Sequence, residues 1–238
     1  MFRAWRRSRL RKQPVPQEWL LALDRYVPFF AELKPDERAR MLSDMQVFLA
    51  EKYFFGAGGL TVTADMPVVV AAAALRLVLH LDVSYYDRLT EIVLYPSGFH
   101  NPHDDEDRDG EAHDWGIVVL AWDAVVEGLA DPNDGYNTVF HEFAHVLDRA
   151  DGSFDGTPRL HRAADYPQWA AVMEREYQRV RALEGTALHP LDDYAGENEA
   201  EFFAVSTEAF FERPDELARE APDLFAELAK FYRTDPRK

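Results

Sequence analysis

The chain has 238 residues, of which 47% are hydrophobic and 13% aromatic, so it can bury a sizeable core and is not of the disordered class. Its formal net charge of −17 argues against nucleic-acid binding by phosphate neutralisation. With no cysteine, disulfides and thiolate metal ligands are excluded, and any metal must be held by His, Asp or Glu.

The amino terminus is basic, and we expect residues 1–15 to form a tail ahead of a single domain over residues 16–238. Met1–Lys12 is rich in arginine, but a polar stretch with prolines follows it, so it is not a secretory signal. The only long apolar run, Met66–Leu75, is interrupted by Arg76 and is too short to cross a bilayer. These features predict a cytoplasmic protein with no membrane and no direct nucleic-acid partner.

Apolar periodicity predicts a mainly helical α+β chain with a few short strands. The predicted helices are Glu18–Tyr26, Pro35–Tyr53, Met66–Leu81 with Asp65 as N-cap, a short helix or turn at Asp123–Leu129, Asn137–Ala150, Pro167–Leu183, Glu197–Phe211, one starting at Pro214, and Pro222–Tyr232. Leu60–Thr63 is a short strand or the start of a helix, and Glu91–Pro96 and Gly116–Trp122 are predicted strands.

The strand Gly116–Trp122 comes just before the segment that carries the metal motif described below. With one free edge, it could hold a peptide by β-augmentation beside a metal site. An interior strand without a free edge is an equal alternative.

A strongly acidic segment, Asn101–Asp114, has seven acidic residues, one arginine, His103 and His113. A charge run of this kind is usually a solvated loop. A calcium loop or second metal site is the alternative, although the spacing matches no EF-hand pattern.

The segment Asn137–Ala150 contains the motif His141-Glu142-x-x-His145. Residues four apart lie one above the other on a helix, so the two histidines can offer imidazole nitrogens to one metal ion. Glu142 points about 100° away from His141, so it flanks the metal and can accept a proton from the attacking water. A solvated or capping histidine pair is the alternative, but the apolar neighbours indicate a buried helix whose polar residues need partners.

Two histidines leave a catalytic zinc ion one protein ligand short, and several acids are candidates for the third ligand. Asp148 shares the helix face of both histidines, but we expect its short side chain to orient an imidazole rather than bind the metal. Asp151 falls six residues after His145, where another zinc peptidase pattern has its third ligand, but the glycine which that pattern needs is replaced by Asp148.

The better candidates lie on the helix predicted at Glu197–Phe211, where Glu197, Glu201 and Glu208 share one strip. Glu201 is followed by Phe-Phe-Ala-Val, so it is the acid least expected to be solvated, and we predict that it is the third ligand. Glu199 lies on the opposite side, Glu197 suits the helix dipole, and Glu208 is a supporting or structural alternative.

The chain resembles the Mlc titration factor A family. The residues that carry this resemblance are His141-Glu-Phe-Ala-His-Val-Leu-Asp, Trp122-Asp123, Gly135-Tyr-Asn, Asp151-Gly, Asp155-Gly and Glu201-Phe-Phe-Ala-Val. The resemblance implies a zincin-like peptidase of the gluzincin type, with an active site similar to that of the anthrax lethal factor catalytic domain. We therefore expect a mainly helical α+β fold with a small β-sheet packed against the active-site helix.

The resemblance also implies functional roles and partners. Glu201 would be the third ligand of one zinc ion per chain, Glu142 the general base, and Tyr194 the hydroxyl that stabilises the transition state. Aminopeptidase-like cleavage of peptide substrates and binding of a Mlc-like transcriptional repressor are the implied activities. The alternative function is a protein that sequesters a regulator and uses its zinc site for structure or weak activity.

Overall fold

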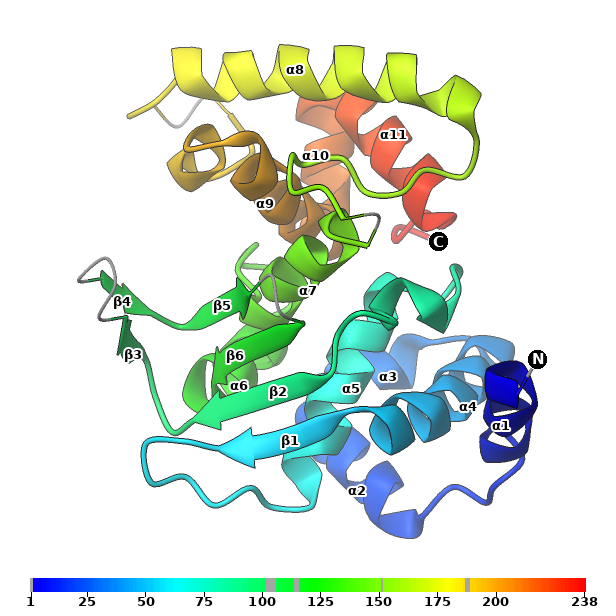
Figure 1. Ribbon diagram of the computed structural model, residues 1–238. Helices are drawn as coiled ribbons and strands as arrows, with labels where there is room; N and C mark the ends of the chain where they lie inside the picture. The colour runs from blue at the N-terminus through cyan, green and yellow to red at the C-terminus, as the bar shows by residue number, and fades with distance from the viewer. Residues whose placement is uncertain (1, 102–105, 114–115, 151, 187–188) are drawn as a thin grey trace. The chain divides into compact units, whose positions relative to one another are not determined.

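The computed structural model describes residues 2–101, 106–113, 116–150, 152–186 and 189–238 (Figure 1). The chain divides into two compact units, residues 1–131 and 132–238, which are described one after the other. The single domain expected over residues 16–238, and the packing of the sheet against the active-site helix, stay predictions.

The first unit is built around helix α5, which is apolar on nearly all sides. Its helices are α1 (Phe2–Leu10), α2 (Gln17–Tyr26), α3 (Pro28–Glu32), α4 (Pro35–Glu51), α5 (Asp65–Leu77), the 3-10 helix η1 (Val83–Tyr86) and α6 (Trp122–Ala130). Helix α5 packs against α2, α4 and α6, and all its residues from 68 to 75 are buried. The helix starts at Asp65 with Ala64 as N-cap, so the predicted capping role of Asp65 is wrong, and it ends four residues earlier than predicted.

The same unit contains a four-stranded mixed sheet in the order β1 (Tyr53–Gly56), β2 (Glu91–Tyr95), β6 (Ile117–Ala121) and β5 (Gly110–His113) (Figure 1). Strands β1, β2 and β6 are parallel, and β5 runs antiparallel to β6. Because β6 is paired on both sides, it has no free edge for a peptide. Of the two alternatives for this strand, the interior one is observed, and the use of β6 for β-augmentation is wrong.

The acidic segment is not one continuous loop. Its described residues form the hairpin of β3 (Phe99–Asn101) with β4 (Glu106–Arg108), and then strand β5. Strand β5 contains His113, whose Nε2 lies 3.6 Å from Glu111 Oε2, whereas His103 lies outside the described residues. Backbone pairing with β3 and β6 stabilises strands that the polar side chains alone do not indicate.

The basic amino terminus forms helix α1, which is held to α4 by charge. Arg7 is only 8% exposed and donates to Glu51 Oε2 and to Asp87 Oδ1, both at 2.6 Å. Arg11 donates to Asp44 Oδ1 at 2.7 Å. Burial alone would raise the pKa of Glu51, but hydrogen bonds from arginine, chiefly Arg7, outweigh it and lower the pKa to about 2.

The second unit is helical in its described residues. It comprises α7 (Thr138–Asp148), η2 (Ala163–Asp165), α8 (Tyr166–Ala182), η3 (Asp193–Gly196), α9 (Glu199–Glu212), α10 (Pro214–Glu220) and α11 (Pro222–Tyr232). Helix α9 packs against α7, η3 and α10, and its buried Phe203 meets Trp169 of α8 and Phe231 of α11 edge to face. This aromatic core fixes α9, the helix that presents the predicted third ligand.

Among the described residues, no helix combines the length and the apolar character that crossing a bilayer requires.

Candidate metal centre

Helix α7 presents the two histidines of the motif. It begins after Asn137, whose side-chain oxygen accepts from the backbone N–H of Phe140 at 3.1 Å, as an N-cap does. The apolar residues of the helix other than Val146 are buried, and the side chains of His141 and His145 are 14% and 6% exposed. The same helix therefore buries an apolar stripe and leaves both imidazoles at the edge of the core.

Helix α9 presents the carboxylate. Asn198 caps this helix and accepts from the backbone N–H groups of Ala200 and Glu201, both at 3.0 Å. Glu201 therefore lies in the first turn, where the helix dipole favours a negative charge. Its side chain is 14% exposed, so the acid is largely withdrawn from water.

The donor atoms of the three residues converge on one point. Glu201 Oε2 lies 3.0 Å from His141 Nε2 and 3.3 Å from His145 Nε2, and the two histidine nitrogens are 3.2 Å apart. A tetrahedral zinc ion with bonds of about 2.0–2.1 Å has ligand atoms about 3.3 Å apart. The spacing of this donor set therefore fits one such ion. Within the described part of the chain, this is the group of three that can hold a metal.

The electrostatics of the cluster follow from burial and from the neighbouring charges. Burial opposes a charge on His141, but the carboxylates of Glu208 and Glu201 outweigh it and raise the pKa of this ring well above its ordinary value. Burial lowers the pKa of His145. The hydrogen bonds from both imidazoles hold the pKa of Glu201 well below its usual range despite its burial. The carboxylate of Glu201 is thus ionised, as a metal ligand must be.

Glu208 contacts both His141 and the start of the helix that carries it. Its Oε1 lies 2.7 Å from His141 Nδ1, and its Oε2 accepts from the backbone N–H of Asn137 at 2.6 Å. A carboxylate on the far ring nitrogen fixes the tautomer and the orientation of a ligating histidine. Of the two roles that the sequence left open for Glu208, the geometry fits the supporting one.

Glu212 extends this row of acids, and the sequence reading missed it because the predicted helix ended at Phe211. Its Oε1 accepts from the side-chain amide of Asn137 at 3.0 Å, and the residue is 4% exposed. Burial raises the pKa of Glu212 to about 8, although the amide hydrogen bond opposes the rise, and the negative charges of Asp134 and Glu208 add to it. Glu212 is therefore largely protonated near neutral pH.

The other candidate ligands lie elsewhere. Asp148 is fully buried, and its Oδ2 accepts from the backbone N–H of Gly156 at 3.0 Å. His145 Nδ1 has no hydrogen-bond partner among the described residues, and His141 Nδ1 contacts Glu208, so the predicted role of Asp148 in orienting an imidazole is wrong. Asp151 lies outside the described residues. Glu197 and Glu199 are exposed and do not belong to the group of three.

The two predicted catalytic residues belong to the same unit as the donors. Glu142 is 6% exposed on α7, and its negative charge contributes to the raised pKa of His141. Tyr194 lies in η3, where its N–H donates to Asp192 at 2.9 Å. Its ring centroid is 5.9 Å from that of His141, and the residue is 45% exposed. Tyr194 is thus both near a ligand and open to solvent.

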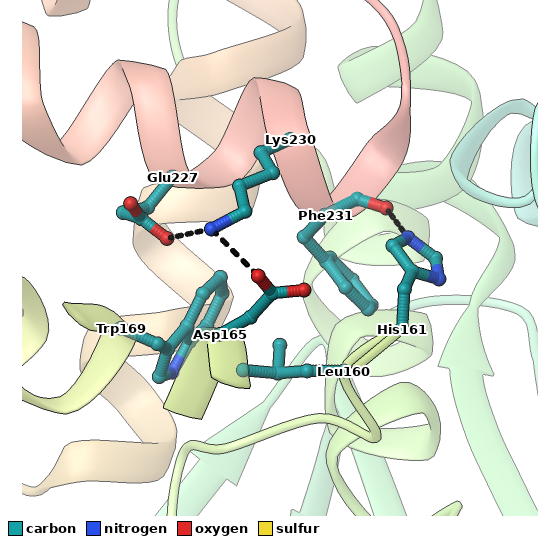
Figure 2. A pocket seen from close by; sticks show the side chains of 7 residues that line it. All are labelled: Leu160, His161, Asp165, Trp169, Glu227, Lys230 and Phe231. Atoms are coloured by element: carbon teal, nitrogen blue, oxygen red, sulfur yellow. Dashed lines mark hydrogen bonds and ion pairs between the residues drawn. The ribbon is translucent and has the colours of Figure 1, made fainter. Parts of the chain in front are cut away.

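A separate small hollow lies in the second unit between α8, α11 and the segment before η2 (Figure 2). Figure 2 shows Lys230 between Asp165 and Glu227, at 3.1 Å and 3.7 Å, and His161 facing the carbonyl of Phe231 at 2.8 Å. The charged side chains of this hollow pair with one another, and none of His141, His145 and Glu201 lines the hollow. The hollow is therefore not part of the metal centre.

Comparison with known proteins gives an independent result. The family described as "Glucose-regulated metallo-peptidase M90" matches residues 2–233. An uncharacterized protein of Synechocystis sp. is 37% identical over 98% of this chain and 89% of its own length. Mlc titration factor A of Yersinia pestis and that of Yersinia pseudotuberculosis are each 28% identical, again over 98% of this chain and 89% of their own length.

Replacing Glu208 tests its supporting role. Both of its oxygens accept hydrogen bonds from α7, and Glu208→Gln replaces one of them with an amide group that cannot accept. We expect the affinity for zinc to fall roughly 10- to 100-fold, measured by competition with a chelator. Glu199→Gln, on the exposed side of the same helix, is the control and should leave the affinity unchanged. An unchanged affinity in Glu208→Gln would show that Glu208 does not support His141.

The raised pKa of Glu212 predicts how stability depends on pH. Above its ordinary pKa of 4.5, the unfolded chain releases a proton that the folded protein keeps until about pH 8, so this group lowers the free energy of unfolding as pH rises. Glu212→Gln mimics the protonated acid and keeps an acceptor for Asn137. Between about pH 5 and pH 8, the free energy of unfolding of the wild type should fall by roughly 3 kcal/mol more than that of this variant.

Urea unfolding at several pH values measures this difference. Glu184→Gln, at an exposed position, should retain the pH dependence of the wild type. Parallel curves for wild type and Glu212→Gln would contradict the assignment of a protonated Glu212.

Proposed function

The chain belongs to the glucose-regulated metallo-peptidase M90 family, and from this premise we propose that it hydrolyses peptide bonds with one zinc ion held by His141, His145 and Glu201. Family membership establishes a zincin-like metallopeptidase, and the predicted mainly helical α+β fold and the resemblance to Mlc titration factor A are confirmed. The observation that carries the zinc proposal is the separation of 3.0–3.3 Å among the three donor atoms. Such a site, with two histidines from HExxH and a later glutamate, is of the gluzincin type.

The proposed mechanism assigns a separate task to each side chain. When bound, the zinc ion would lower the pKa of a water molecule and polarise the peptide carbonyl. Glu142 accepts the proton of the attacking water and returns it to the leaving amine. Support for this role comes from its place next to His141 on α7 and from the effect of its charge on that ring. Glu208 keeps His141 oriented during these steps.

Tyr194 serves as the donor to the oxyanion in this proposal. Tyr194 is 45% exposed, and its ring centroid lies 5.9 Å from that of His141. A substrate carbonyl near the proposed ligands can therefore come close to this side chain. A hydrogen bond to the developing negative charge lowers the barrier more than it stabilises the bound substrate.

The finer substrate assignment is aminopeptidase-like cleavage, which rests on the family resemblance alone. Short peptides with a free amino terminus and their acetylated counterparts distinguish it from internal cleavage. An aminopeptidase hydrolyses only the free forms, whereas an endopeptidase accepts both.

A second proposed role is the binding of a Mlc-like repressor in the cytoplasm. The observation that favours it is the similarity, over nearly the whole chain, to proteins named Mlc titration factor A. In the alternative reading this sequestration is the main role, and the zinc site serves structure or weak activity. The two functions separate when hydrolysis is abolished without loss of the fold.

Glu142→Gln makes that separation. The variant keeps the three donors but has no group that can accept the proton, so kcat should fall by roughly 100- to 10,000-fold. Elemental analysis should still find one zinc ion per chain, and binding to a Mlc-like repressor should persist if sequestration is a separate function. Glu174→Gln, exposed on α8, is the control. Hydrolysis by Glu142→Gln at the wild-type rate would refute the general base.

Tyr194→Phe removes only the phenolic hydroxyl. If this group stabilises the transition state, kcat should fall roughly 100- to 1,000-fold while KM and zinc content change little. Steady-state kinetics on short peptides measures both constants, and Tyr53→Phe, at an exposed position of β1, serves as the control. A rise in KM with unchanged kcat would mean that Tyr194 only binds the substrate.

A further inference from the structure

Phe154 lies beside the metal centre on the loop that follows α7. Its ring centroid is 5.4 Å from that of His145, with an angle of 61° between the planes, and the residue is 45% exposed. A single exposed aromatic residue is common on protein surfaces. This one differs because it contacts a metal-ligating histidine and is held there by its surroundings.

The loop that carries Phe154 is fixed to both ligand-bearing helices. The buried carboxylate of Asp148, at the end of α7, accepts from the backbone N–H of Gly156 at 3.0 Å. Gly156 has a φ of +74°, and a Cβ there would lie 2.2 Å from the backbone oxygen of Glu199 in α9. The loop backbone thus lies directly against α9, so the helices that position the ligands also position Phe154.

Arg149 holds the ring itself. Its guanidinium carbon lies 3.7 Å from the ring centroid of Phe154, which is cation–π geometry. The exposed part of Phe154 is the surface that Arg149 and His145 leave uncovered. An apolar surface is therefore presented next to His145, and the guanidinium of Arg149 lies against the same ring.

We propose that Phe154 forms the wall of an apolar subsite that receives a bulky apolar side chain of the peptide, at one of the two residues flanking the hydrolysed bond. This proposal rests on the proposed peptidase function. A peptide carbonyl held at the His141, His145 and Glu201 group places the flanking side chains within a few ångströms of the ligands. On the His145 side, such a side chain meets Phe154, and contact with the ring removes apolar surface from water. Lysine or arginine is disfavoured at the same position because its charge would leave water for an apolar surface.

The test compares peptides that differ at one flanking residue at a time, with Phe, Leu, Ala or Lys at that position. Wild type should prefer Phe and Leu at one position and hydrolyse the Lys peptide least. In Phe154→Ala, KM for the Phe and Leu peptides should rise roughly tenfold, with kcat nearly unchanged. The Ala peptide should change less than about twofold, since it makes little contact with the ring. Phe154→Leu, which keeps an apolar wall, should recover most of the loss.

A binding measurement separates the subsite from catalysis. In the Glu142→Gln background, calorimetry should show that Phe154→Ala weakens binding of the Phe peptide roughly tenfold and leaves that of the Ala peptide unchanged. Phe2→Ala, which removes an exposed phenylalanine from α1, is the matched control and should affect neither peptide. Zinc content and the midpoint of urea unfolding establish that each variant is folded and loaded.

The possible failures are distinct. If zinc-loaded wild type hydrolyses none of the peptides, the proposed function is wrong, and the calorimetry still decides the subsite. If Phe154→Ala weakens the Phe and Ala peptides equally, or neither of them, the subsite proposal is overturned while the peptidase assignment stands.

Discussion

A row of carboxylates on α9, buried or largely buried, holds helix α7 in place, and the candidate metal centre depends on it. Glu201 meets both imidazoles, Glu208 meets His141 and the backbone at Asn137, and Glu212 meets the side chain of Asn137. Buried acids are costly unless they are paired or protonated, and here each finds its partner on the same facing helix. The ligand geometry and the start of α7 are therefore determined by one set of contacts.

The acids of this row differ in the direction in which their pKa values are shifted. The two imidazoles beside Glu201 lower the pKa of this acid, whereas burial near Asp134 and Glu208 raises the pKa of Glu212. Negative charge is thus concentrated where a cation can bind and is suppressed at the far end of the row. His141, between Glu201 and Glu208, connects the two regions.

Much of the site could be read from the sequence because it depends on local spacing. The motif on α7 places two histidines one turn apart on any helix, and Glu201 could be chosen because an apolar run follows it in the sequence. Glu212 was missed because it lies one residue beyond the predicted end of its helix, where boundaries are least certain. Phe154 follows no periodic pattern, and its place beside His145 depends on backbone contacts across the fold.

The strands show the same division between local and non-local information. Strands β2 and β6 are rich in branched apolar residues and were predicted near their observed bounds. Strand β1 follows α4 almost directly and was not predicted; its first residue, Tyr53, was assigned to the end of the preceding helix. Strand β5 has a polar sequence and forms because β6 offers it a partner. Pairing of this kind is decided by residues far away in the chain.

The contact between α1 and α4 differs in character from the rest of the first unit, where apolar surface dominates. It consists largely of guanidinium–carboxylate pairs, while Phe2 and Trp5 of α1 point away from the core and are 77% and 56% exposed. Dissolved ions screen exposed charge pairs strongly and buried pairs much less. Salt should therefore weaken the exposed pair of Arg3 with Asp87 and leave the largely buried pair of Arg7 with Glu51, which keeps α1 on α4, nearly intact.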